Sequence, residues 1–139
     1  MKRLYPAFLL FFLVLHSGCK KYIQQQEENA VVAAVTNGYW YVSEYLQNDS
    51  TITASFSGYL FKFDANGIVT GTKDSISVKG SWSANISTRQ IVSTFPTAGP
   101  PLKYLNETWN IKDSYTNFVS AISTDTVNST SNVLQLTKQ

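Results

Sequence analysis

The sequence predicts an all-β fold, an eight-stranded antiparallel up-and-down barrel. Three observations indicate it. From residue 39 onward, apolar and polar residues alternate with period two in short segments. Clusters of Asn, Asp, Gly, Ser and Pro separate these segments at roughly even spacing. After Gly38 no segment keeps a helical period over roughly ten residues. Closure into a barrel would remove the edges that such a sheet otherwise exposes.

The individual strands follow from this alternation. Ile76, Val78 and Trp82 share one face of the clearest segment, and Phe61 and Phe63 share a face of an earlier one. The turn sequence Asp-Ala-Asn-Gly at 64–67 predicts a hairpin, and the Gly-Pro-Pro run at 99–101 predicts a loop, with a possible helical turn at 102–105. The strands are expected at 39–46, 58–64, 68–73, 76–84, 89–95, 107–113, 117–123 and 132–138.

The first 19 residues have the pattern of an export signal. Lys2 and Arg3 precede nine apolar residues at 7–15, too few for a bilayer core, which needs about 20 helical residues. Ser17-Gly18-Cys19 resembles a bacterial lipobox, whose cysteine is lipid-modified and becomes the mature N-terminus. His16 stands where that motif prefers Leu or Val, and an ordinary signal peptide with an incidental cysteine is the alternative.

Three parts of the chain are therefore expected: a signal peptide at 1–18, a lipid-anchored tether at 19–36 and a barrel domain at 37–139. The polar segment 20–29 is expected to be disordered, whereas 30–35 could form a short helix or pack on the domain. Lys20 is not the Asp associated with inner-membrane retention in some bacteria, which favours the outer membrane, on either face.

Composition excludes several functions. Without Lys2 and Arg3, nine basic residues balance nine acidic ones, so the overall charge supports neither nucleic acid nor an anionic substrate as a partner. The sole histidine, His16, lies in the signal, and the sole cysteine is expected to carry lipid. Disulfides, Cys/His zinc sites and His-dependent nucleophiles are therefore not expected. We expect no enzyme activity, cofactor or metal; the turn at 64–67 resembles a calcium loop only at its start, because Ser75 replaces the later carboxylate.

Five short motifs follow one another along the chain: Gly-Tyr-Trp at 38–40, the aromatic strand at 56–63 before Asn66-Gly67, Lys-Gly-Ser-Trp-Ser at 79–83, Leu-Asn-Glu-Thr-Trp at 105–109 and Leu-Gln-Leu at 134–136. Together they resemble the small lipocalin-like domains of Gram-negative bacterial lipoproteins. The resemblance covers about 37–139 and implies a barrel without a known substrate. Larger lipocalins pair the first-strand Trp with a late Arg, but the only Arg after Cys19 is Arg89. Complete closure therefore stays an open question.

Six residues are candidates for a ligand-facing surface or for the core: Trp40, Glu44, Phe61, Phe63, Trp82 and Trp109. Large aromatic residues more often fill a small barrel than line a pocket. Glu44 breaks the apolar side of the first strand, so it points inward if Trp40 and Val42 do. The alternative register buries Tyr39, Tyr41 and Tyr45 instead.

Asp followed by a hydroxyl residue and then an apolar residue or Thr occurs three times, at 49–51, 74–76 and 125–127. This pattern resembles an O-glycosylation motif on exported proteins of one group of Gram-negative bacteria, with Ser50, Ser75 and Thr126 as the acceptors. Ordinary turn chemistry explains the same residues equally well.

Two functional hypotheses remain. The first is a lipid-anchored binding or accessory module of the cell envelope, which presents its barrel to a small apolar ligand or to another protein. The second is a structural or interaction lipoprotein with a filled barrel and no ligand. In both, the membrane is a partner through the lipid on Cys19.

Overall fold

The structure, a computed structural model, describes the backbone of residues 18–139 and the side chains of residues 25–139. The signal peptide expected at the N-terminus lies outside this part of the chain except for Gly18, and the Cys19 side chain is not described.

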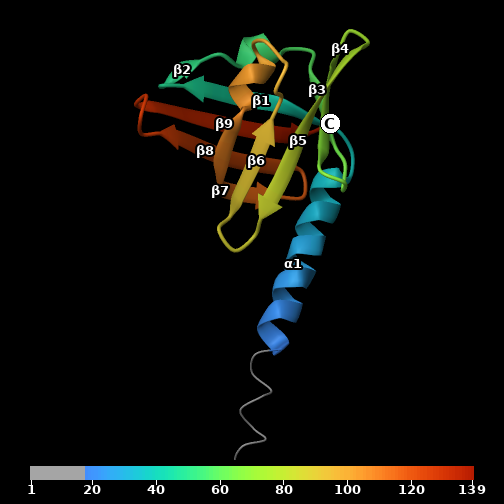
Figure 1. Ribbon diagram of the computed structural model, residues 1–139. Helices are drawn as coiled ribbons and strands as arrows, with labels where there is room; N and C mark the ends of the chain where they lie inside the picture. Colours follow the sequence, from blue (N-terminus) through green and yellow to red (C-terminus); the bar gives the residue numbers. More distant parts are fainter. Residues whose placement is uncertain (1–17) are drawn as a thin grey trace, which may run out of the picture.

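Eight antiparallel strands form a barrel, as predicted, and one further two-residue strand is attached to the first (Figure 1). β2 pairs with β1 alone, and each of the other eight strands pairs with the next of these eight along the chain. β1 also pairs with β9, so the barrel is closed, a point that the sequence left open. The strands are β1 Trp40–Gln47, the short β2 Ser50–Thr51, β3 Leu60–Phe63, β4 Ile68–Lys73, β5 Ile76–Asn85, β6 Gln90–Thr94, β7 Glu107–Tyr115, β8 Phe118–Asp125 and β9 Thr130–Lys138. The helical turn expected at 102–105 is the 3₁₀ helix η3, Leu102–Leu105, and a second one, η2, is Thr53–Phe56.

Helix α1, Gly18–Thr36, precedes the barrel. We expected 20–29 to lack regular structure, but this segment is helical. Figure 1 shows the N-terminal part of α1 running away from the strands. Only the last turns of α1 meet the barrel, where Val35 is buried and Val31 and Val32 pack against the core. Of the two alternatives for 30–35, the structure therefore combines a helix with packing on the domain.

Strand β1 contains a β-bulge between Val42 and Glu44, which resolves the choice between the two predicted registers. Trp40 and Val42 point into the barrel before the bulge, and Tyr45 points into it afterwards, with a 0% exposed side chain. A bulge adds one residue to one strand and so reverses the faces of the residues that follow. Each predicted register is thus correct for half of the strand, and Glu44 is only half-buried.

β1 pairs much more extensively with one of its two neighbours in the barrel wall than with the other. Seven residue pairs join β1 to β9, but Trp40 and Phe61 are the single pair between β1 and β3. The segment that contains η2 lies beside this joint, where the backbone N–H of Ile52 donates to the carbonyl of Tyr45 (2.9 Å). The barrel is therefore closed, with its weakest strand pairing between β1 and β3.

Strand directions define two ends of the barrel. At the end where α1 meets it, which we call the α1 end, lie the turns at 64–67, 86–89 and 116–117. At the opposite end, which we call the far end, lie the turns at 48–49, 74–75 and 126–129 and the loop at 95–106. The predicted hairpin at 64–67 is confirmed, with Gly67 at φ 86° and its N–H donating to the carbonyl of Asp64 (3.0 Å).

Candidate ligand-binding site at the barrel mouth

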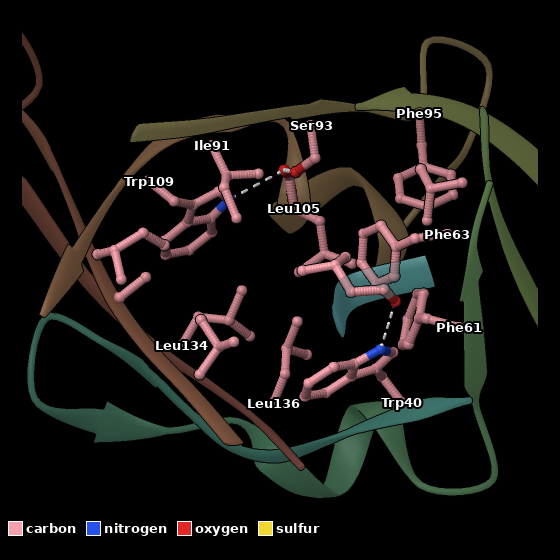
Figure 2. Close-up of a pocket in the computed structure, with 15 residues that line it drawn as sticks. Trp40, Phe61, Phe63, Ile91, Ser93, Phe95, Leu105, Trp109, Leu134 and Leu136 are labelled. Carbon is pink, nitrogen blue, oxygen red and sulfur yellow. Dashed lines mark hydrogen bonds between the residues drawn. The ribbon is translucent and has the colours of Figure 1, made fainter. Parts of the chain in front are cut away.

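A small apolar cavity occupies the middle of the barrel (Figure 2). Its volume is about 50 Å³, and Ser93, whose hydroxyl donates to the carbonyl of Leu105, is the one polar residue in its wall. The wall is formed by Val35, Trp40, Phe61, Phe63, Val69, Ile91, Ser93, Phe95, Leu105, Trp109, Ile111, Val119, Ala121, Leu134 and Leu136. So small a cavity holds at most a few water-sized groups, and its apolar wall favours an empty or apolar interior.

Most of the aromatic candidates fill the barrel around this cavity. Trp40, Phe61, Phe63 and Trp109 line it and are buried. Trp82 is buried as well but does not line it; its ring packs edge-on against Phe63, with the centroids 5.5 Å apart.

Each indole N–H of the three tryptophans donates to a backbone carbonyl. The acceptors are Val35 for Trp40 (2.9 Å), Asp64 for Trp82 (2.9 Å) and Leu105 for Trp109 (3.3 Å). Two of these bonds are drawn in Figure 2. Buried indole groups need such a partner. These rings are therefore fixed as core and present no free donor to a ligand.

A larger groove of about 580 Å³ lies between α1 and the α1 end of the barrel. This volume is in the range of small-molecule sites in proteins, about 300–1,000 Å³. The groove is lined by Glu27, Ala30, Val31, Ala34, Val35, Trp40, Ala84, Asn85, Ile86, Arg89, Gln90, Ile91, Ile111, Ser114, Tyr115, Thr116 and Val119. We call it the mouth groove.

The mouth groove and the inner cavity share five apolar side chains, those of Val35, Trp40, Ile91, Ile111 and Val119. These residues form the floor of the groove and, on their other side, the wall of the cavity. These five side chains therefore separate the mouth groove from the inner cavity.

The position of α1 over the mouth is set by three donors from the barrel wall. The indole of Trp40 donates to the carbonyl of Val35, and the Nζ atoms of Lys62 and Lys138 donate to the carbonyls of Thr36 and Ala34. The last carbonyls of a helix have no partner within the helix, and cations interact favourably with this end of the helix dipole. The barrel thus caps the C-terminus of α1.

Lys138 also lies over the Trp40 ring, with Nζ 4.9 Å from the ring centroid. A cation over an indole face is attracted by the ring. Lys138 at the end of β9 therefore packs on the tryptophan of the first strand.

The polar side chains of the mouth groove come from three elements. Glu27 belongs to α1, Asn85, Arg89 and Gln90 to the β5–β6 hairpin, and Ser114 and Thr116 to the β7–β8 hairpin. Gln90 is held by Asn110, to whose side-chain oxygen it donates (3.0 Å). Arg89 is exposed and donates one N–H to the carbonyl of Lys112 (3.3 Å). The groove therefore has an apolar floor and polar groups around it.

A second polar group, the far-end polar cluster, consists of Glu107, Ser123 and Asn132. Ser123 and Asn132 are buried, and the Asn132 amide donates to Ser123 Oγ (3.2 Å) and weakly to Glu107 Oε1 (3.5 Å). Within the described chain the Asn132 Oδ1 atom is buried without a hydrogen-bond partner.

Burial is the main cause of the raised pKa of Glu107 and of Tyr45, whereas hydrogen bonds set the pKa shift of Asp125. Loss of solvent raises the pKa of Glu107, repulsion from Asp125 raises it further, and a hydrogen bond from Ser123 lowers it. Burial likewise raises the pKa of Tyr45, whose hydroxyl donates to the carbonyl of Tyr104 (2.7 Å). The pKa of Asp125 is lowered, because Asn128 and the N–H of Val127 donate to its carboxylate.

The remaining candidates lie away from the mouth groove. Glu44 is not in the wall of the groove or of the inner cavity. Ser50, Ser75 and Thr126 are exposed, beside or within turns, and all three are at the far end.

Among the described side chains, no three His, Cys, Asp or Glu residues come together as a metal site. Within residues 18–139, α1 is the longest helix, and neither it nor any other helix has the length and apolarity needed to span a bilayer.

The fold and the groove define a class: a closed eight-stranded antiparallel barrel with an apolar groove between its mouth and a flanking helix. No family model matches the chain, and no curated protein matches it. Among solved structures, it is similar to the crystal structure of a DUF4847 family protein from Bacteroides vulgatus, with a TM-score of 0.55 and 17% sequence identity. The match covers 78% of this chain and 99% of that one. At this identity the likeness shows the fold alone.

Sequence reasoning did not single out most of the groove. Ile91 and Ile111 lie within two of the expected strands, but they were not named as site residues, and neither were Val35, Val119 and Arg89. The groove exists because α1 docks on the mouth, and the docking contacts join residues such as Ala34 and Lys138 that are far apart in the sequence. The only local signal was the apolar segment at 30–35.

Proposed function

We propose that this protein is a lipid-anchored binding module of the cell envelope, whose lipocalin-like barrel takes a small apolar ligand at the mouth groove. The observation that supports this most is the shared floor of the groove and the inner cavity. A groove of about 580 Å³ backed by a central apolar cavity has the size and the lining of a ligand site.

A probe of binding is the neutral dye N-phenyl-1-naphthylamine, whose fluorescence rises in apolar surroundings. Residues 25–139 as a soluble chain should bind it saturably. Ile91→Trp fills the groove floor and should weaken binding by roughly tenfold or more. Val92→Trp is the matched control, because Val92 is the next residue on β6 and is exposed on the outer face. Equal affinity in the two variants would place the dye elsewhere and contradict the proposal.

The alternative is a structural lipoprotein with a filled barrel and no ligand. The small volume of the inner cavity and the fixed indole groups favour it. The same titration separates the two functions: a well-folded chain that binds neither the dye nor other apolar small molecules supports the structural role.

Anchoring through Cys19 is the second part of the proposal. Each buried CH₂ of an acyl chain contributes about 0.8 kcal/mol, so two or more chains give stable attachment. A full-length Cys19→Ala protein should leave the membrane fraction of its host and keep the unfolding transition of the domain. Retention of the variant in the membrane fraction would show that Cys19 is not the anchor.

A further inference from the structure

Arg89 occupies a backbone position that its side chain does not favour. Its φ is 54°, in the left-handed region that suits glycine and, less well, Asn and Asp. The other non-glycine residues at positive φ in the described chain are all short and polar, namely Asn48, Asp49, Asp74, Ser75 and Ser129. An arginine in this conformation is a local strain, and such strain is often kept for a function.

The backbone around Arg89 holds this conformation firmly. Its N–H donates to the carbonyl of Ile86 (3.2 Å), and its carbonyl accepts from the N–H of Ile111 (2.8 Å). Thr88 is fixed in the same turn, with its N–H donating to Asn85 Oδ1 (3.1 Å). The side chain is consequently directed from a rigid point at the β5–β6 turn.

The guanidinium of Arg89 donates one N–H to the carbonyl of Lys112 (3.3 Å). Among the described residues no carboxylate forms an ion pair with it. It lines the mouth groove, whose floor is apolar. Glu27, the one acidic residue of the groove lining, belongs to the α1 wall and not to the hairpin. The part of the groove beside the β5–β6 hairpin, which contains Arg89, therefore favours an anion.

We infer that the ligand of the mouth groove is an elongated apolar molecule with one carboxylate, and that Arg89 binds this carboxylate. This inference rests on the proposed function. A guanidinium offers paired N–H donors that match the two oxygens of a carboxylate, and it keeps its charge at all ordinary pH values. The apolar part of the ligand lies on the floor formed by Ile91, Ile111 and Val119.

The test compares dodecanoic acid with its methyl ester as competitors of N-phenyl-1-naphthylamine at pH 8. The two share the apolar chain and differ in the charge. The wild-type domain should bind the acid roughly tenfold more tightly than the ester, as expected for one charge-assisted contact. In Arg89→Gly the acid and the ester should bind equally.

Arg89→Gly is suited to this test because glycine fits the positive φ, so the variant should fold at least as well as the wild type. Ser129→Gly is the matched control: it also relieves a positive φ, at 53°, but in a far-end turn without a charge. It should keep the preference for the acid.

A preference for the acid that survives in Arg89→Gly, or its absence in the wild type, overturns the role of Arg89 while leaving ligand binding intact. If neither acid nor ester displaces the dye and no apolar molecule binds, the proposed function itself fails, and this inference with it.

Discussion

At the scale of single residues, Trp82 tests whether the barrel is filled. Its side chain is 6% exposed, packs on Phe63 and donates to the carbonyl of Asp64. Replacing a large buried aromatic residue with alanine removes its contacts and leaves a void. Trp82→Ala should therefore lower the free energy of unfolding by about 3–5 kcal/mol in denaturant.

Tyr115→Ala is a control for that measurement, because Tyr115 is 67% exposed and should change stability by less than about 0.5 kcal/mol. A loss below about 1 kcal/mol for Trp82→Ala would contradict a filled barrel around this side chain.

The titration of Glu107 in the far-end polar cluster makes the stability of the folded protein depend on pH. Its folded pKa is raised from the ordinary 4.5, first by burial and then by Asp125, so the fold favours the protonated form. This contribution to stability is complete below pH 4.5 and is lost as the pH rises through the folded pKa.

Glu107→Gln should remove that loss and so gain stability relative to the wild type above the folded pKa. Urea unfolding at a series of pH values measures the difference. The pKa of Asp125 is lowered, so its contribution to the stability of the protein is lost as the pH falls. Both proteins contain Asp125, so this contribution is common to them. A difference between the two proteins that does not change from pH 4 to pH 8 would contradict the assignment.

The bulge in β1 could not be predicted from the local sequence. The sequence placed Trp40 and Val42 on one face and Tyr45 on the other, with Glu44 as the exception. An inserted residue moves Tyr45 into the core and Glu44 out of it. The irregular position of Glu44 was visible, but a bulge depends on the partner strand, and no local pattern specifies that register.

At the scale of elements, the backbone of β5 lies close to the end of β6 at Gly80. A Cβ atom there would lie 2.3 Å from the carbonyl oxygen of Thr94 and 2.9 Å from Phe95 Cδ1. The backbone of β6 cannot move away without breaking its pairing with β5 and β7. Gly80→Ala should thus destabilise the domain by about 1–3 kcal/mol in thermal or denaturant unfolding.

Gly99→Ala is the matched control, because a Cβ atom at Gly99 meets no atom within 4 Å. It should be neutral or slightly stabilising. If both alanine variants unfold like the wild type, the close approach at Gly80 is not a constraint.

The strands were more predictable than the helix. Alternation and turn residues specified all eight strands of the barrel, because each strand has one buried face and one wet face. The N-terminal part of helix α1 was missed because this polar segment has no apolar stripe, whereas a short helix at 30–35 was one of two alternatives. What holds its C-terminus is a set of donors from β1, β3 and β9, and such long-range caps leave no trace in the local sequence.

At the scale of the whole molecule, the three Asp-hydroxyl motifs share one end of the barrel. Ser50, Ser75 and Thr126 are exposed at the far end, opposite α1. If they carry glycans, protein purified from its native host should exceed the mass of the chain plus lipid, and replacing all three with alanine should remove the excess. A native mass explained by chain and lipid alone would leave the motifs as turn residues, a role that the Asp125 carboxylate already fills with its bonds to the N–H groups of Val127 and Asn128.

The mouth groove is also a feature of the whole molecule. It is built from α1, the β5–β6 hairpin and the β7–β8 hairpin, which only the folded barrel brings together. The burial of Trp40 and Trp109 could be predicted, because it follows from strand alternation. The groove could not, since it is a space that packing leaves between segments distant in the sequence.

The pairing of β1 with β9 also orders the folding of the chain in time. β1 is the earliest strand of the barrel to leave the ribosome, and its main partner, Thr130–Lys138, is the latest. Until then the growing sheet has two unsatisfied edges, and contacts across so long a stretch of chain form slowly. Closure of the barrel therefore waits for β9, and a nascent chain halted before β9 would display strand edges that can pair with another molecule.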